Sequence, residues 1–261
     1  MRHIYFSVLV LILFFSCSPD VEIPCIPSKL ANNVIAFYPF SVGNLSDKAL
    51  NKFDLTSLGN SAVVKDRNGN ERCAYRFNGQ SDQYLFRNGD FLNNLKNKSY
   101  SVSLWYQPLL GKNDRQVLLA KGERGMTKCN SLLIEEWFII LHDCERVSYY
   151  MDGKCQWGDF PTLWQDSTII DKCNAELMLY ENTWHHLAVT YDNGMPTVFL
   201  DGIKSQNKLQ DWGACVPVKE NIGDIFIGKG FYGDIDDIII FDKALTQTEV
   251  NQLFNLEACC I

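Results

Sequence analysis

The 261-residue sequence lacks any cluster of basic residues. Its 24 Lys and Arg are outnumbered by 31 Asp and Glu, which gives a formal net charge of -7. Proteins that bind nucleic acid concentrate positive charge on one face to neutralise phosphates. We therefore expect no nucleic-acid partner.

Common catalytic motifs are also missing. The sequence contains no G-x-S-x-G elbow, no H-E-x-x-H motif and no phosphate-binding glycine loop. The ten cysteines form no C-x2-C pair, and only Cys259 and Cys260 are adjacent, so zinc-ligand spacing is absent. These absences leave no residue pattern for nucleophilic, phosphoryl-transfer or zinc chemistry.

A short apolar run opens the chain. Residues 4–15 are too few to span a bilayer comfortably but suit a signal peptide. The run ends in FFSC, which resembles the lipobox of bacterial lipoproteins, where Cys17 would be acylated; the two phenylalanines depart from the usual residues. We predict a signal peptide over 1–16, and a lipidated cysteine with a proline-containing tether over 17–31. A plain secretory signal and an uncleaved membrane anchor stay open as alternatives.

The expected location follows from this signal. A lipidated protein is exported and held by its acyl chains, here at the bacterial outer membrane, on its periplasmic or cell-surface face. Nine further cysteines fit such an oxidising compartment, so we expect disulfides. Nine is odd, so at least one thiol stays free or pairs with another chain, and spacing does not fix the connectivity. We expect Cys144 and Cys155 to close one local loop.

Most of the chain has the pattern of an all-β protein. Short runs rich in Val, Ile, Phe and Tyr recur between Gly, Asn and Asp clusters, which is typical of a sandwich or barrel. These runs cover residues 34–40, 100–108, 116–122, 137–143, 224–230 and 234–242. The single helical pattern follows the last of them, where Thr246 and Glu249 form a capping box ahead of an apolar face.

The segment 184–202, WHHLAVTYDNGMPTVFLDG, predicts a β-hairpin around the turn at Asn193-Gly194. Successive strand side chains point to opposite faces. His185 and His186 therefore cannot coordinate one metal ion together, and we expect them to pack within the sheet.

Four segments, in order, resemble the laminin-G-like jelly-roll domain of the concanavalin A-like lectin and glucanase superfamily. They are FNGQSDQYLF (77–86), SVSLWYQP (101–108), the hairpin, and IGKGFYGDIDDIIIFDKALTQTEVNQLF (227–254). The resemblance implies an all-β jelly-roll sandwich of two antiparallel sheets, one of them concave, and the residue pattern adds one short C-terminal helix. We assign this domain to residues 32–257 and a C-terminal tail to 258–261. Residues 123–181 depart from the family pattern, being longer and richer in Cys and Trp.

Retaining glucanases of this fold place two carboxylates on one strand in an E-x-D-x-x-E pattern, which is absent here. We therefore expect no enzyme activity. Carbohydrate binding usually needs an exposed aromatic side chain beside polar groups. Trp157, Trp164 and Trp212 lie in loop-like sequence and are the candidates, although each could instead cover the core; Trp105 and Trp184 lie in strand patterns, where we expect core residues.

Many relatives hold a structural Ca²⁺, so the resemblance also suggests a calcium site. Hard oxygen ligands suit this ion. Asp236 is the candidate by its position in the closing strand, and Asp82 is a second, with turn capping as its alternative role.

The sequence thus favours a non-catalytic recognition domain for a glycan. One alternative is a protein-binding or structural adhesin that docks another envelope protein through residues 123–181. The other is a divergent glycosidase, which would need two carboxylates that converge in a groove. A glycan site should show an aromatic side chain in a polar groove, whereas a protein site should show a larger exposed apolar patch.

Overall fold

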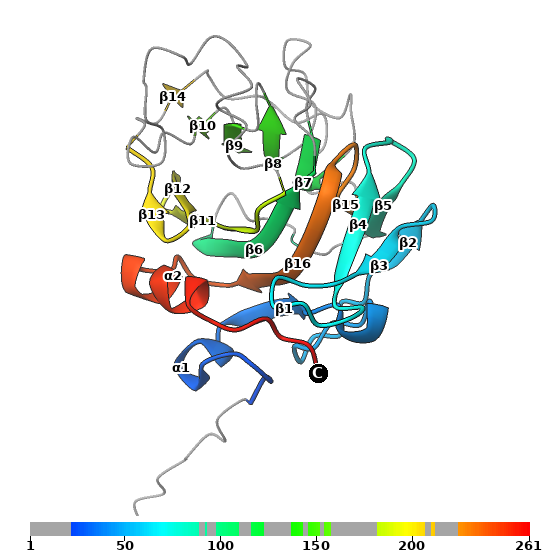
Figure 1. Ribbon diagram of the computed structural model, residues 1–261. Helices are drawn as coiled ribbons and strands as arrows, with labels where there is room; N and C mark the ends of the chain where they lie inside the picture. Colours follow the sequence, from blue (N-terminus) through cyan, green and yellow to red (C-terminus); the bar gives the residue numbers. More distant parts are fainter. Residues whose placement is uncertain are drawn as a thin grey trace, which may run out of the picture.

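The computed structural model consists of two antiparallel sheets that pack face to face (Figure 1). This confirms the sandwich and the fold class expected from the sequence. The residues that the structure describes are 22–88, 92, 98–109, 116–122, 137–142, 146–151, 154–157, 182–206, 210–211 and 224–261.

The first sheet runs in the order β13 (Ile203–Lys204), β12 (Met195–Leu200), β11 (His185–Asp192), β6 (Tyr100–Pro108), β16 (Tyr232–Phe241), β4 (Ala74–Asn78) and β3 (Ala62–Val64), with β1 (Val34–Tyr38) also paired to β16. The second runs in the order β14 (Gln210–Asp211), β10 (Lys154–Trp157), β9 (Arg146–Met151), β8 (Trp137–His142), β7 (Gln116–Lys121), β15 (Ile225–Ile227), β5 (Tyr84–Arg87) and β2 (Thr56–Leu58).

Alternation along the strands sends one set of apolar side chains into the space between the sheets. In the predicted hairpin of β11 and β12, Leu187 and Val189 point inward and are fully buried. Across the strand pair, Leu187 lies opposite Leu104 of β6, which belongs to the same core. Full burial of such a side chain contributes about 1.5–3 kcal/mol. The hairpin turn is the expected one, with Asn193 and Gly194 both at positive φ.

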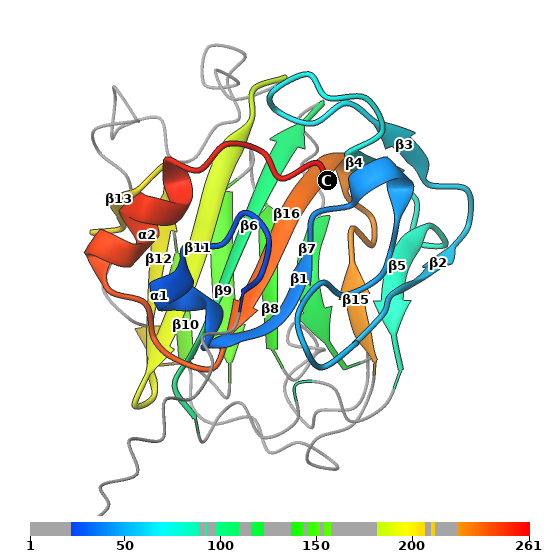
Figure 2. The same cartoon turned by 90° about the horizontal axis from the view of Figure 1, so that it is seen from below.

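The other face of the first sheet is partly covered by segments from both ends of the described chain. Figure 2 shows α1 (Ser28–Ala31), α2 (Gln247–Phe254) and the C-terminal segment, residues 255–261, lying across it. A second apolar cluster fills this layer and contains Ile23, Ile26, Leu30, Ala188, Phe199, Ile239, Phe241, Val250, Leu253 and Cys259. No described helix is long and apolar enough to cross a membrane.

Helix α2 begins as predicted. The Thr246 side chain accepts a hydrogen bond from the Glu249 N–H, and the Glu249 carboxylate accepts one from the Thr246 N–H. This capping box satisfies N–H groups that have no partner inside the helix, and Val250 and Leu253 then point into the covered layer.

Two disulfides hold the C-terminal segment against the rest of the domain. Cys259 pairs with Cys25 and Cys260 pairs with Cys73. The described part of the segment for which the sequence suggested a tether is therefore folded, since residues 22–31 carry Cys25, α1 and buried apolar side chains. The tail expected over 258–261 is likewise fixed, with Cys259 buried.

Candidate functional site

A row of side chains crosses the uncovered part of the outer face of the first sheet. Asp234 of β16 lies opposite Gln107 of β6 on one side and Arg76 of β4 on the other. Trp184 comes just before β11, whose His185 pairs with Tyr106, so Trp184 extends the row next to Gln107. Three strands and the residue just before a fourth, all distant in sequence, thus bring one aromatic and three polar side chains into a line.

These residues lie in a groove of about 390 Å³. Its lining consists of Val64, Lys65, Asp66, Glu71, Arg76, Gln107, Trp184 and Asp234. Lys65, Asp66 and Glu71 belong to the loop between β3 and β4, residues 65–73, which we call the Arg67 loop. The groove therefore has an aromatic residue at one side and a charged loop at the other.

Trp184 corrects an expectation from the sequence. Strand alternation put it on the same face as His186, and it was expected in the core. It is only half-buried and lines the groove. Trp105 is also only partly buried, so it too lies outside the core where it was expected, although its ring stacks on Phe254 of α2 at 5.9 Å between centroids.

Arg76 and Asp234 form a two-bond ion pair within the groove. Arg76 Nε and Nη2 each donate to an Asp234 carboxylate oxygen at 2.7 Å. The Arg76 side chain is 44% exposed, whereas that of Asp234 is 2% exposed. Asp234 thus fixes the orientation of Arg76 from below, and the guanidinium keeps three further N–H groups as donors.

The remaining polar groups supply both donors and acceptors. Gln107 Nε2 donates to the Asn182 carbonyl at 2.7 Å, which leaves the Gln107 side-chain carbonyl as an acceptor. Lys65 and Glu71 form an exposed ion pair of 2.8 Å on the Arg67 loop. The Asp66 carboxylate accepts bonds from the N–H groups of Asn68 and Asn70 within the same loop.

The strand pattern alone did not identify this site. Arg76, Gln107 and Asp234 were not predicted as site residues, since a single polar residue within a strand pattern does not indicate a binding site. The available signal was indirect: pairing the strands in the family's order places them beside Trp184 on one face.

Behind the groove, Asp236 lies in a buried ion cluster. A β-bulge after Asp236 shifts the register with β6, so that Asp236 and its neighbour Asp237 share the outer face. Arg67 Nη1 lies 2.6 Å from Asp237 Oδ2 and 3.3 Å from Asp236 Oδ2. Because a guanidinium already faces both carboxylates, the residues around Asp236 do not fit a calcium ion. Asp82 is exposed in the turn between β4 and β5, and calcium binding there stays a prediction.

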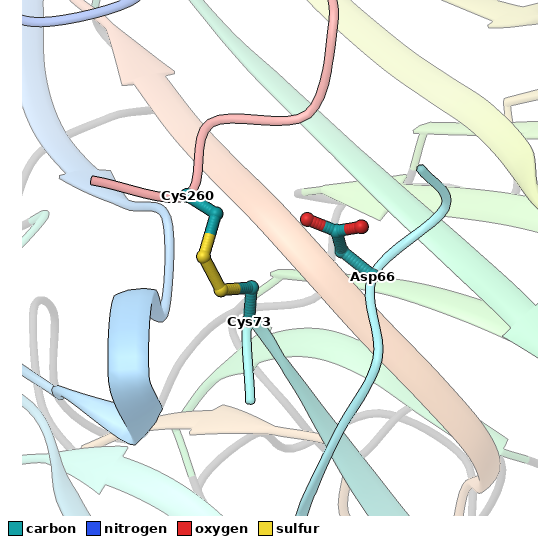
Figure 3. A group of neighbouring side chains, drawn as sticks. All are labelled: Asp66, Cys73 and Cys260. Atoms are coloured by element: carbon teal, nitrogen blue, oxygen red, sulfur yellow. A yellow bond between two sulfur atoms is a disulfide. The ribbon is translucent and has the colours of Figure 1, made fainter. Parts of the chain in front are cut away.

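The described residues contain one group of three possible metal ligands, Asp66, Cys73 and Cys260 (Figure 3). The two sulfurs are joined in a disulfide and the Asp66 carboxylate is bonded within its loop, so this group does not fit a metal ion in the oxidised protein.

The two histidines lie on opposite faces, as expected. His185 Nδ1 is 2.8 Å from Asp201 Oδ2, while His186 Nε2 is 2.8 Å from Ser103 Oγ beneath α2. Burial lowers the pKa of His186 to about 3, so this imidazole is neutral at pH 7.

Several predicted site residues cannot be placed. Trp157 ends strand β10 rather than lying in a loop, and Cys155 belongs to the same strand, but their side chains lie outside the described residues. The other predicted positions outside the described residues are Cys17, Cys144, Trp164 and Trp212.

Comparison with known proteins gives the class of this domain. Residues 78–251, more than half of the chain, match the Laminin_G_3 family model, described as the concanavalin A-like lectin/glucanases superfamily. The chain belongs to this family. No curated protein matches it by sequence.

Solved structures share the fold at low sequence identity. Domain 4 of AbnA, a GH43 extracellular arabinanase from Geobacillus stearothermophilus solved in complex with arabinotriose, has a TM-score of 0.59 and 20% identity, over 85% of this chain and 98% of that domain. The botulinum neurotoxin serotype D binding domain has a TM-score of 0.60 and 15% identity, over 87% of this chain. The binding domain of Paraclostridial Mosquitocidal Protein 1 has a TM-score of 0.60 and 19% identity, also over 87% of this chain. The chain spans about half the length of the two toxin domains (51% and 52%).

Proposed function

We propose that this chain is a non-catalytic carbohydrate-binding protein whose groove beside Trp184 holds a sugar. The observation that carries the proposal is the half-buried Trp184 within a groove that is otherwise lined mainly by polar side chains. Sugars present apolar C–H faces as well as hydroxyl groups, so they need this combination. The arabinotriose complex of the similar arabinanase domain supports the same class of ligand.

Each part of the groove has a role in this proposal. The Trp184 ring packs against a C–H face of the sugar, Arg76 donates hydrogen bonds to hydroxyl oxygens, and the Gln107 carbonyl accepts one from a hydroxyl. Asp234 holds Arg76 in place, so little side-chain entropy is lost on binding.

The charges of the groove support binding rather than hydrolysis. Glycosidases need one carboxyl group as acid and a second as nucleophile or base. Asp234, Glu71 and Asp66 are each bonded to other groups of this chain. The described carboxyl pair with raised pKa values, Asp236 and Asp237, lies beneath the C-terminal segment beside a cavity of only about 10 Å³.

A protein ligand at this groove has less support. The exposed large apolar side chains among the described residues are Val42, Leu50, Leu58, Met195 and Ile261, and none of them lines the groove. A protein-binding surface would be expected to include such side chains. Docking of an envelope protein elsewhere on the chain stays an alternative.

We place this domain at the bacterial envelope, anchored through acylated Cys17. Seven residues lie between Cys17 and Cys25, which is already fixed to Cys259. The eight steps from Cys17 to Cys25 span at most about 28 Å when extended, so the domain would lie close to the membrane. Incorporation of a labelled fatty acid into the wild-type protein, and its loss in Cys17→Ser, tests the anchor.

The test of sugar binding uses the chain from Ser18 to Ile261, which keeps every described residue, with its cysteines oxidised. A glycan array identifies the ligand, and calorimetry then compares variants. Trp184→Ala should weaken binding about 30-fold or more, the loss typical of a central aromatic contact, whereas Trp184→Phe keeps a flat ring and loses less. Leu50→Ala, an exposed apolar residue outside the groove, should bind as the wild type does. Folded protein that binds no array sugar, or a Trp184→Ala variant of unchanged affinity, would contradict the proposal.

A further inference from the structure

The Arg67 loop has two sides with different roles. Lys65, Asp66 and Glu71 face the groove and form one of its walls. Arg67 points the other way, into the covered layer, where its side chain is only 7% exposed. A buried guanidinium needs partners for its N–H groups and for its charge.

Arg67 finds these partners on three other parts of the fold. Nη1 contacts the carboxylates of Asp236 and Asp237 on β16. Nη2 donates to the carbonyl of Leu256 in the C-terminal segment at 3.1 Å, and the guanidinium carbon lies 4.3 Å above the ring of Trp105 on β6. One side chain thus ties the groove wall to two strands and to the C-terminal segment.

Arg67 supplies a positive charge to the two carboxyl groups that face it. Burial raises the pKa of both aspartates, that of Asp237 to about 6, and for Asp236 the nearby Asp237 carboxylate raises it further. Arg67 lies within ion-pair distance of both carboxylates, so its positive charge opposes this rise. Asp237 Oδ2 also accepts the Cys259 N–H at 3.1 Å.

We infer that the Arg67 guanidinium is a built-in cation that takes the place of a bound metal ion at Asp236 and Asp237, and that it positions the groove wall. Neither stability nor ligand binding should then depend on calcium at Asp236 and Asp237. The statement about stability stands by itself, while the statement about the wall rests on the proposed sugar binding.

Thermal unfolding of the oxidised chain from Ser18 in millimolar calcium and in EDTA is the first test. The midpoint should be the same in both buffers for Asp82→Asn, which removes the other candidate calcium ligand. A midpoint that falls in EDTA in this variant would show that a cation bound away from Asp82 stabilises the protein, and it would overturn the inference. This comparison needs no substitution at Arg67, so it holds even if such variants fail to fold.

The second test removes the charge with Arg67→Met, and Arg72→Met in the same loop is the matched control, because Arg72 is exposed. Arg67→Met should lower the midpoint by roughly 6–20 °C, as expected when a buried ion pair loses one partner. Calcium should restore part of that loss, since two carboxylates and the Leu256 carbonyl then form a set of oxygen ligands. If Arg67→Met is destabilised and calcium does not change its midpoint, Arg67 acts only through packing. That result would overturn the inference that its guanidinium takes the place of a metal ion.

Ligand affinity tests the positioning of the wall, measured at a temperature where both variants are folded. Arg67→Met should bind the array-selected sugar roughly tenfold more weakly, about the value of one well-placed hydrogen bond, while Arg72→Met is unchanged. Equal affinity in Arg67→Met would overturn the positioning role. If the wild type binds no sugar, the proposed function fails, and the calcium comparison still decides the cation role.

Discussion

His186 should make the protein sensitive to acid, and the size of the effect follows from its surroundings. The imidazole is fully buried between Trp105, Phe254 and Ser103, and burial lowers its pKa to about 3. In the unfolded chain its pKa is near 6.5. Between these values the unfolded chain binds a proton that the folded protein does not, so stability is lost as pH falls from about 6.5 towards 3.

The shift of roughly 3.5 pKa units corresponds to about 5 kcal/mol of unfolding free energy at about 1.36 kcal/mol per unit. Asp237 acts in the opposite direction. Its folded pKa of about 6 exceeds the unfolded value of 3.8, so its contribution is fully present below pH 3.8 and is lost as pH rises through about 6. The pKa of Asp236 is also raised by burial and acts with the same sign, so the two aspartates mask part of the histidine effect in the wild type.

Denaturant unfolding of the oxidised protein at a series of pH values measures both effects. His186→Gln keeps a polar group that can reach Ser103 but cannot titrate. Its unfolding free energy should fall less than that of the wild type from pH 6.5 to pH 3, by up to about 5 kcal/mol. Asp237→Asn removes a contribution that is lost as pH rises. Between pH 4 and 6 its unfolding free energy should therefore fall more than that of the wild type as the pH is lowered. If the unfolding free energies of the wild type and His186→Gln changed in parallel with pH, the reasoning would be refuted.

Three further predictions address other parts of the structure. Cys25→Ser should lower the unfolding free energy of the oxidised protein by about 2–5 kcal/mol, and an unchanged denaturation midpoint would contradict the pairing with Cys259. Gly228→Ala should cost about 1–3 kcal/mol in urea unfolding, because its φ is 76° and a Cβ would lie 2.4 Å from the Phe77 ring; a neutral result would contradict that contact. Arg76→Leu should weaken sugar binding roughly tenfold with little change in midpoint, and wild-type affinity would remove Arg76 from the site.

Local patterns predicted the strands and the helix well. Alternation identified β11 and both faces of its side chains, from Leu187 inward to Ala188 outward. The capping box at Thr246 identified the start of α2, because a cap depends only on residues three apart.

Long-range pairing could not be predicted in the same way. Cys25 and Cys73 are bonded to cysteines 234 and 187 residues away, and no spacing in the sequence points to these partners. The same limit applies to Arg67, whose ion partners are about 170 residues further along the chain.

Trp184 shows why the site itself was missed. Alternation assigns a side chain to a face of the sheet, but it does not say which part of that face other segments will cover. Trp105 and Trp184 belong to the same outer face and both are partly buried, yet the Trp105 ring contacts α2 whereas Trp184 lines the groove.

The most direct test of the central claim follows the indole N–H signals of the six tryptophans by NMR during a titration with the array-selected sugar. Trp184→Phe assigns the Trp184 signal by its disappearance. The account predicts that this signal shifts saturably while that of Trp105, beneath α2, stays in place. A sugar that binds and leaves the Trp184 signal unmoved would contradict the claim that the groove is the binding site.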